Sequence, residues 1–255
     1  MNERLSDAAN RLIVKKRDSS ADPVNLCGLN STKEAYDIQA CTLSLLCANV
    51  VGWKASLSAD SSVLSAPIFD CDLFFSGETL PIQRMKDGVE CELAFVIDTA
   101  LGPLPVSGYT RPDVIPCIGG VMAAFELLDS RLVELFQSPM PHLLADNLGN
   151  GGVVLGMANP SWQEHDLLEI AVELTVDNVT VLSRRAGHPA GDPIDVVVAL
   201  ANHLAHRGKI LEPGQFIMTG SYTGVHKVEA GQNLAATFAG FGSSVLHVAP
   251  AQNDY

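Results

Sequence analysis

Positive charge is scarce in this sequence, where 16 lysines and arginines stand against 29 aspartates and glutamates and give a formal net charge of −13. The bases cluster nowhere beyond residues 15–17 and 184–185, so we expect no nucleic-acid-binding or anionic-membrane-binding surface. A small anionic substrate is compatible with this charge if a bound metal reverses the local field. No apolar run reaches the roughly 18 residues that a membrane span needs, and no signal-peptide pattern opens the chain. We therefore expect a cytoplasmic, soluble protein.

The cysteines of this sequence are not spaced as metal ligands. None of the six cysteines forms a Cys-x-x-Cys pair, and none is spaced as a zinc ligand beside histidine, so they are interpreted as reduced core residues. The chain holds no internal repeat and no low-complexity segment. With 255 residues, 47% of them hydrophobic, it is long enough for one large domain or a main domain with a smaller appendage.

Two helices are predicted before any strand. Apolar residues recur at the spacing of one helical stripe over residues 3–16. The capping-box spacing of Ser31 and Glu34 begins a second helix, and a strand-like run follows from Val50. We therefore expect an N-terminal helical segment at 1–48 and a β-rich catalytic domain at 49–255.

Two acids interrupt an otherwise apolar, strand-like run at residues 89–97. Because side chains alternate faces along a strand, Glu90 and Glu92 point the same way. Successive positions on one face lie roughly 6.5 to 7 Å apart, close enough for two carboxylates to converge on one hard cation. Glu126 is the only charge in the apolar run 120–128. Burying three carboxylates without a countercharge would be costly or would force protonation, so the pattern favours a divalent cation.

A simpler interpretation of these acids stays open at this point. Glu90 and Glu92 would form the solvated face of an edge strand, and Glu126 would pair with Arg131. A single Glu-x-Glu pattern is more typical of such a face than of a metal site. The apolar surroundings of Glu126 bring the two interpretations close to parity.

Lys54 and Asp70 are candidates for proton transfer. Lys54 shares a strand face with Val50 and Gly52 rather than with other charges, which favours a partly desolvated amine. The alternative is a lysine whose long side chain reaches water. Residues 65–75 are predicted as a loop that enters a strand, in which Asp70 is either a catalytic acid or a turn residue.

The second half of the chain contains fewer candidate residues. We predict an irregular loop over 139–152, a β-hairpin that turns at 177–178, and a helix between an N-cap at Asp192 and a stop at Gly208. A strand then runs into a turn rich in glycine and hydroxyl groups around Ser221. The N–H groups of such a turn can hold a carboxylate.

Together these stretches resemble the fumarylacetoacetate hydrolase superfamily, and within it the branch of 2-keto-4-pentenoate hydratases and 2-oxo-hexenedioate decarboxylases. The similarity covers nearly the whole chain from the second helix onward. Each motif is short, but their order and spacing make the match specific. The motifs are Val51-Gly52-Trp53-Lys54, residues 89–95, residues 125–131, Ala145-Asp146-Asn147, Gly187-His188-Pro189 and Thr219-Gly220-Ser221.

The resemblance implies an α+β fold, namely a mixed β-sandwich roll with an N-terminal helical segment and outer helices. It implies a divalent cation, Mg²⁺ or Mn²⁺, held by Glu90, Glu92 and Glu126. It also implies a homo-oligomer, a dimer or larger. Association with a decarboxylase or hydratase partner of the same pathway is a further option.

The expected substrate is a small 2-oxo acid of aromatic-compound catabolism. On this resemblance the cation grips the carboxylate and 2-oxo oxygens and stabilises an enolate. Lys54 acts as an acid/base residue, and Ser221 holds the substrate carboxylate. Arg131, which lies within one of the motifs, is a second candidate for substrate binding. Addition of water then gives a 4-hydroxy-2-oxo acid.

One departure from the family pattern leaves the reaction open. Characterised hydratases carry a longer loop that ends in Pro-Asp-Phe-Gly, whereas this chain has Ile68 in the place of that aspartate, followed by Phe69 and Asp70. The alternatives are decarboxylation of a 2-oxo-enedioate, hydrolysis of an acylpyruvate, and a non-catalytic binding or accessory subunit. Hydrolysis would need a His-Glu pair in the N-terminal segment, but the first histidine is His142.

Overall fold

The computed structural model describes residues 3–58 and 60–251 and is built from five α-helices, short 3-10 turns and twelve strands within those ranges. The α-helices are α1 Glu3–Arg17, α2 Thr32–Leu46, α3 Arg111–Val114, α4 Met140–Ala145 and α5 Pro193–His206. The strands are β1 Val50–Leu57, β2 Val63–Phe69, β3 Leu73–Phe75, β4 Thr79–Leu80, β5 Gly88–Ile97, β6 Ile118–Leu128, β7 Asn150–Leu155, β8 Ala171–Val176, β9 Val179–Arg185, β10 Phe216–Met218, β11 Asn233–Phe238 and β12 Gly242–Val248.

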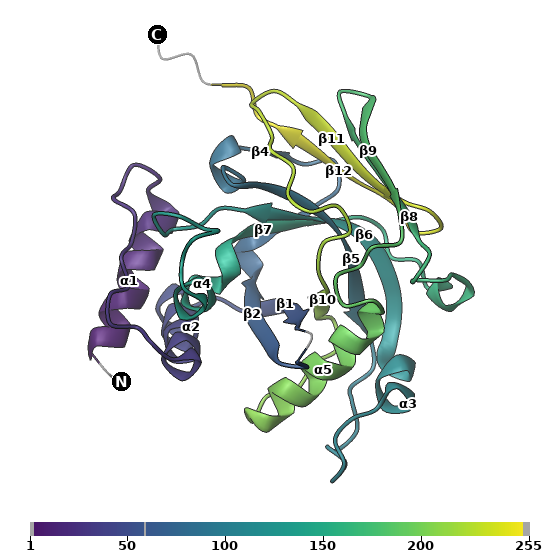
Figure 1. Cartoon of the computed structure of the whole chain (residues 1–255), viewed down its shortest axis with the longest axis horizontal. Helices are drawn as coiled ribbons and strands as arrows, with labels where there is room; N and C mark the ends of the chain where they lie inside the picture. Colours follow the sequence, from purple (N-terminus) through teal and green to yellow (C-terminus); the bar gives the residue numbers. More distant parts are fainter. Residues whose placement is uncertain (1–2, 59, 252–255) are drawn as a thin grey trace.

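Two sheets form the body of the molecule. Among the described residues, the larger sheet has seven strands in the order β2-β1-β10-β5-β6-β7-β3, and the smaller has five in the order β4-β12-β11-β8-β9. The larger sheet curls on itself, and the smaller sheet packs on its outside next to β6 and β7 (Figure 1). The helices also lie outside the curl. The expected mixed roll with outer helices is therefore confirmed.

β5 and β6 pair antiparallel at the centre of the larger sheet. One face of β5 is fully buried in the main apolar core, which includes Leu93 and Phe95 together with residues of the smaller sheet and of α5. The other face points into the curl, where Ala94 packs in a smaller apolar cluster. The alternation predicted for residues 89–97 is confirmed, and it directs Glu90 and Glu92 into the curl.

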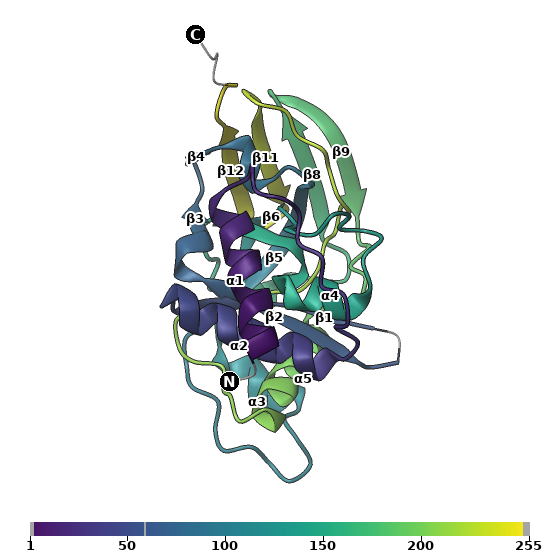
Figure 2. The same cartoon turned by 90° about the vertical axis from the view of Figure 1, so that its left-hand side faces the viewer.

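The N-terminal helices pack together and against α4 on one side of the roll (Figure 2). The buried stripe of α1 includes Leu5, Leu12 and Ile13, as the periodicity predicts. The Ser31 hydroxyl accepts a hydrogen bond from the Glu34 N–H at 3.2 Å, which confirms the predicted start of α2. Because these helices share a hydrophobic core with residues of α4, they cover the sheet rather than extend from it.

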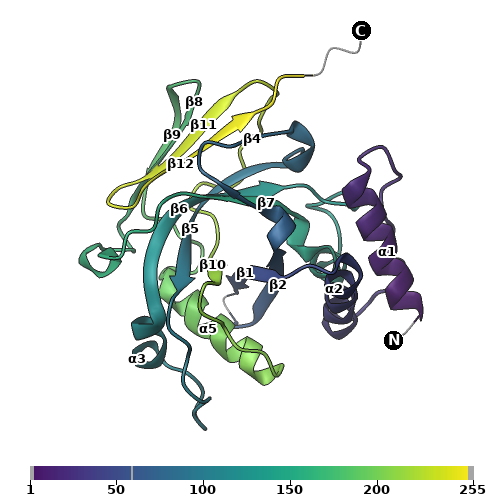
Figure 3. The same ribbon diagram turned by 180° about the vertical axis from the view of Figure 1, so that it is seen from behind.

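The predicted helix and hairpin of the second half are also present. The Asp192 side chain caps α5 by accepting from the Ile194 N–H at 2.9 Å. Figure 3 shows α5 on the outside of the curl, below β10 and β1. Asp177 and Asn178 both have positive φ, 48° and 64°, which is the geometry of a tight two-residue hairpin turn.

Two predicted loops are ordered elements instead. Residues 65–75 form the end of β2, a 3-10 turn and β3. Pro67 lies within β2, which is an edge strand, where a missing N–H is tolerated. Residues 139–152 contain α4 and the start of β7. Pro141 lies in the first turn of α4, where a helix needs no N–H donor.

The cysteines are all free thiols, as expected, but only half of them lie in the core. Cys41, Cys91 and Cys117 are buried, whereas Cys27, Cys47 and Cys71 are exposed. The core placement was therefore wrong for the latter three. Within the ranges that the structure describes, no helix has the length and apolar character to cross a membrane.

Candidate metal and substrate site

Three carboxylates converge inside the curled sheet. Glu90 and Glu92 come from the same face of β5, and Glu126 lies directly opposite Glu90 on β6. One oxygen of each residue lies within 4.8 Å of the corresponding oxygens of the other two. The interpretation of Glu90 and Glu92 as a solvated edge face is therefore wrong, because β5 is a central strand.

Burial makes this cluster electrostatically unfavourable without a cation. Glu92 and Glu126 are only 2% and 1% exposed. Burial, followed by the charge of Glu126, raises the pKa of Glu90 to about 7 and the pKa of Glu92 well above its ordinary range. Carboxylate oxygens are the hard ligands that Mg²⁺ and Mn²⁺ prefer. The donor set therefore fits a divalent cation, which would offset the mutual repulsion.

Neighbouring groups orient each of the three acids. The Gly220 N–H donates to Glu92 Oε2 at 2.9 Å. Asn150 Nδ2 donates to Glu126 Oε1 at 3.4 Å, and the Ser221 hydroxyl forms a hydrogen bond with Glu90 that lowers the pKa of that carboxyl. These contacts hold the carboxylates in one arrangement before any ligand arrives.

Lys54 adjoins the cluster. Its side chain is 13% exposed, and its ammonium forms an ion pair with Glu126. Nζ also donates to the Leu148 carbonyl at 3.0 Å. Leu148 and Asn147 have left-handed backbone angles, with φ of 55° and 49°, so this carbonyl belongs to an unusual turn. The lysine does not reach out to water but lies beside the acids.

A cavity of about 260 Å³ opens next to Lys54 and Glu90. The rest of its wall is apolar and comes from the end of β6, from residues between β6 and β7, and from the segment after Ser221. These residues are Leu128, Leu135, Phe136, Leu143, Leu148 and Val225. The arrangement gives a small chamber with a charged end and an apolar end, which suits a short organic acid.

The structure brings together Lys54, Glu90, Glu92, Glu126 and Ser221 but places Asp70 elsewhere. Asp70 is exposed at the start of the 3-10 turn after β2 and accepts from Asn49 Nδ2 at 2.8 Å. Ile68, at the position of the family aspartate, is fully buried in the apolar cluster inside the curl. Neither residue lines the cavity beside Lys54.

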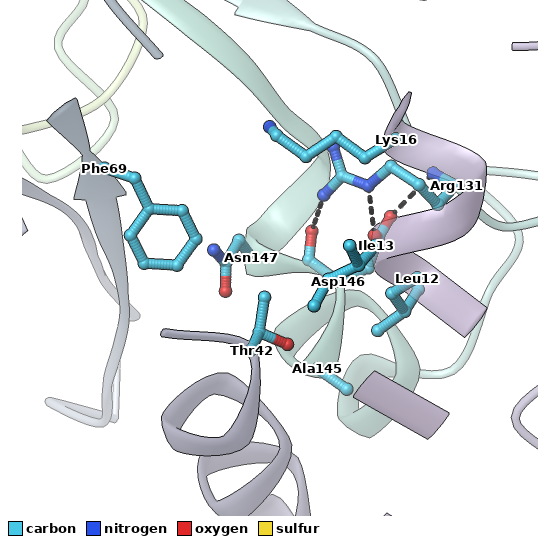
Figure 4. Close-up of a pocket in the computed structure, with 9 residues that line it drawn as sticks. All are labelled: Leu12, Ile13, Lys16, Thr42, Phe69, Arg131, Ala145, Asp146 and Asn147. Carbon is cyan, nitrogen blue, oxygen red and sulfur yellow. Dashed lines mark hydrogen bonds and ion pairs between the residues drawn. The ribbon is translucent and has the colours of Figure 1, made fainter. Parts of the chain in front are cut away.

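Arg131 also lies away from that cavity, in a buried network beside α1 (Figure 4). Its guanidinium pairs with Asp146 and donates to the carbonyls of Asp129 and Asn150 at 2.5 and 2.6 Å. The Ser130 hydroxyl donates to Asp146 at 2.9 Å. Arg131 therefore does not pair with Glu126, the partner that the simpler interpretation assigned to it. Its network fixes the segment that leads into the turn at Asn147.

The residues that contact the acids and Lys54 from distant parts of the chain were not predicted from the sequence. Asn150 and the Leu148 carbonyl lie in a stretch that was predicted to be irregular. Asp146 and Asn147 stood in a motif that carried the family resemblance, but without a partner to indicate their role. The apolar cavity wall had one available signal, namely large hydrophobic residues such as Phe136 in a segment without strand or helix periodicity.

Fold and acidic cluster together define the class: an α+β roll with a candidate divalent-metal centre beside a lysine. Residues 50–249 match the model of the fumarylacetoacetate (FAA) hydrolase C-terminal family, and the chain belongs to this family. The matched region begins where the helical segment ends and the strands begin.

Relatives with the names of the hydratase and decarboxylase branch match this chain. A 2-keto-4-pentenoate hydratase of Burkholderia vietnamiensis is 28% identical over 257 residues, covering 94% of this chain and 92% of the relative. A 2-oxo-hept-4-ene-1,7-dioate hydratase of Escherichia coli is 30% identical over 203 residues, covering 76% and 75%. The structure of 4-oxalocrotonate decarboxylase from Pseudomonas putida G7, complexed with magnesium and adipate, superposes with a TM-score of 0.84 at 24% identity over 97% and 98% of the two chains.

Proposed function

We propose that this protein is a metal-dependent hydro-lyase, which adds water to a 2-hydroxy-2,4-dienoate and gives a 4-hydroxy-2-oxo acid. The observation that carries the proposal is the cluster of Glu90, Glu92 and Glu126 beside Lys54 at the charged end of a small cavity. Relatives named hydratases, aligned over most of the chain, support the same reaction.

Glu90, Glu92 and Glu126 are the proposed ligands of Mg²⁺ or Mn²⁺. Lys54 and Asn150 both contact Oε1 of Glu126, so within the described residues its Oε2 is the oxygen without such a contact. When bound, the cation supplies a Lewis acid that favours negative charge on the 2-oxo oxygen of the substrate. Solved structures of similar fold that hold metals, namely the magnesium complex of the decarboxylase and a Mn²⁺ complex of a fumarylpyruvate hydrolase from Pseudomonas aeruginosa, support this assignment.

Lys54 is the proposed proton carrier. In the proposed step the 2-hydroxyl of the dienoate loses one proton and C5 gains one. The product of this proton shift is a 2-oxo-3-enoate. Lys54 lines the cavity and can exchange a proton with the substrate there, while the Leu148 carbonyl fixes the direction of its amine. Water then adds its hydroxyl at C4 and its proton at C3.

The turn around Ser221 is the proposed anchor of the substrate carboxylate. Gly220 has a positive φ of 119°, and the hydroxyl of Ser221 accepts from the Gly224 N–H at 2.9 Å. The same hydroxyl lies next to Glu90, with which it forms a hydrogen bond. The catalytic role of Asp70 and the substrate-binding role of Arg131 stay predictions; each residue makes its contacts outside the cavity.

Turnover of 2-hydroxypenta-2,4-dienoate tests the proposal. Protein treated with a chelator and then supplied with Mg²⁺ should remove the absorbance of the dienol, and the product should be 4-hydroxy-2-oxopentanoate containing one oxygen from solvent water. Without Mg²⁺ the rate should fall to background. Release of CO₂ from an enedioate in place of hydration would assign the decarboxylase reaction, and binding without turnover would assign the non-catalytic role.

We also propose that the chain forms a homo-oligomer of cytoplasmic location and that residues 1–48 and 49–255 are its two structural units. The start of the family match at residue 50 supports this boundary. Light scattering on the purified protein measures the oligomer directly. A single-chain mass at micromolar concentration would contradict the proposed assembly.

A further inference from the structure

The apolar end of the cavity bears on which 2-oxo acid the protein takes. This question rests on the proposed function, in which the charged end binds the carboxylate and 2-oxo group. Members of the branch differ at the other end of the substrate, because the E. coli relative is named for a dioate and the P. putida decarboxylase holds adipate, a dicarboxylate. A second carboxylate needs a cationic or hydrogen-bonding partner wherever it leaves water.

The cavity wall offers no such partner. Apart from Lys54 and Glu90, its lining in the described part of the chain consists of the six apolar residues named above. Lys54 is already paired with Glu126 at the charged end. The wall therefore provides contact for a hydrocarbon tail and no countercharge for a distal anion.

The bases that follow the cavity wall along the chain are engaged elsewhere. Arg131, three residues after Leu128, is buried against Asp146. Lys227, two residues after Val225, donates to the Asp87 carbonyl at 2.9 Å. Neither belongs to the lining of the cavity. Moving the Lys227 ammonium or the Arg131 guanidinium to the apolar end of the cavity would break these contacts.

Large apolar side chains at the cavity are left partly in water. Phe136 is 67% exposed and Val225 is 38% exposed, although both line the chamber. A substrate with an uncharged tail would cover these surfaces, which is favourable in proportion to the apolar area removed from water. A terminal carboxylate in the same place would lose part of its hydration and gain no countercharge.

We propose that the site is selective for 2-oxo and 2-hydroxydienoic monoacids with an uncharged distal end, and that Phe136 and its apolar neighbours disfavour dioates. Substrates that end in hydrogen or a short alkyl group fit the chamber. Dioates of the same carbon number bind more weakly because their second charge meets a partly exposed apolar wall without a countercharge.

Binding of two acids of equal length tests the selectivity without relying on turnover. With Mg²⁺ present, 2-oxohexanoate should bind at least about 10-fold more tightly than 2-oxoadipate, since a carboxylate that loses part of its hydration without a countercharge is disfavoured. Titration calorimetry gives both dissociation constants. Equal affinities, or tighter binding of 2-oxoadipate, would overturn the selectivity even if the dienoate is hydrated.

An introduced cation gives a second test with a matched control. Phe136→Arg places a charge at the cavity mouth, and 2-oxoadipate should then bind about 5-fold more tightly, as for an exposed ion pair. Val133 is also 67% exposed but does not line the cavity, so Val133→Arg should leave the affinity unchanged. Equal gains in both variants would show only a general charge effect and would overturn the role of Phe136.

The outcomes separate this selectivity from the proposed hydration. If the protein prefers 2-oxohexanoate but hydrates no dienoate, the hydratase assignment is wrong and the selectivity stands. Hydration of mono- and diacids at similar kcat/KM would keep the hydratase and remove the selectivity. If neither 2-oxo acid binds at millimolar concentration, the charged end does not take this class of compound and both proposals fall.

Discussion

Replacing Asp146 by asparagine removes the negative charge from the most enclosed ion pair around the site. Asp146 is 1% exposed and Arg131 is 4% exposed, and the pair is surrounded by α1, α2 and the turn at Asn147 (Figure 4). Burial raises the pKa of Asp146, and the charge of Arg131 opposes that rise. In the variant the guanidinium stays buried with neutral acceptors only.

The expected loss of stability depends on the acceptors that remain around Arg131 in the variant. Removal of one partner of a buried pair destabilises a protein by about 3 to 5 kcal/mol, because the other charge is left without compensation. Asparagine keeps an acceptor oxygen, and Arg131 keeps the carbonyls of Asp129 and Asn150. We therefore expect the lower end, about 3 kcal/mol, or a decrease in Tm of about 6 to 12 °C for a chain of this length.

Urea unfolding followed by circular dichroism measures this loss. Asp37→Asn is the matched control, because Asp37 pairs with Lys33 on the exposed face of α2. The control should change the free energy of unfolding by less than about 0.5 kcal/mol. A loss below about 1 kcal/mol in Asp146→Asn would refute the reasoning, since the buried arginine would then not depend on its partner.

Two further predictions concern Lys54 and His188. Lys54→Met should lower kcat for dienoate hydration by about 10² to 10⁴ while Mn²⁺ affinity stays within about tenfold of the parent value, and normal turnover would remove Lys54 from the mechanism. Burial lowers the pKa of His188 from 6.5 to about 4, so the unfolded chain takes up the proton first as pH falls and stability declines below about pH 6.5. Between pH 7 and pH 5 the parent should lose about 2 kcal/mol more than His188→Gln, and equal losses measured by urea unfolding would contradict the depressed pKa.

Local pattern was enough to predict the acidic strand. Alternation along residues 89–97 places Glu90 and Glu92 on one face, and the isolation of Glu126 in an apolar run marks it as unusual. Their meeting also depends on the register between β5 and β6. A shift of one residue would turn Glu126 to the opposite face, and no property of either strand alone reveals the pairing.

The roles predicted for Arg131 and Asp70 lack support because they depend on contacts between distant parts of the chain. Arg131 looked available because its partner Asp146 lies in another segment, and only the fold brings them together. Asp70 looked like a substitute for the family aspartate, but the 3-10 turn after β2 points it to the surface. The carbonyl that holds Lys54 comes from a left-handed turn at Leu148, a conformation that leucine rarely adopts and that sequence does not indicate.

Direct measurement of Mn²⁺ binding to the metal-free protein tests the central assignment. Titration followed by electron paramagnetic resonance should show one ion bound per chain, and Glu126→Gln should weaken its affinity by about 100-fold or more, beyond the loss seen for residues that only support a ligand. Glu169→Gln, which changes an exposed glutamate paired with Arg185, should bind as the parent does. If Glu126→Gln binds Mn²⁺ as tightly as the parent protein, the three acids do not form the metal site.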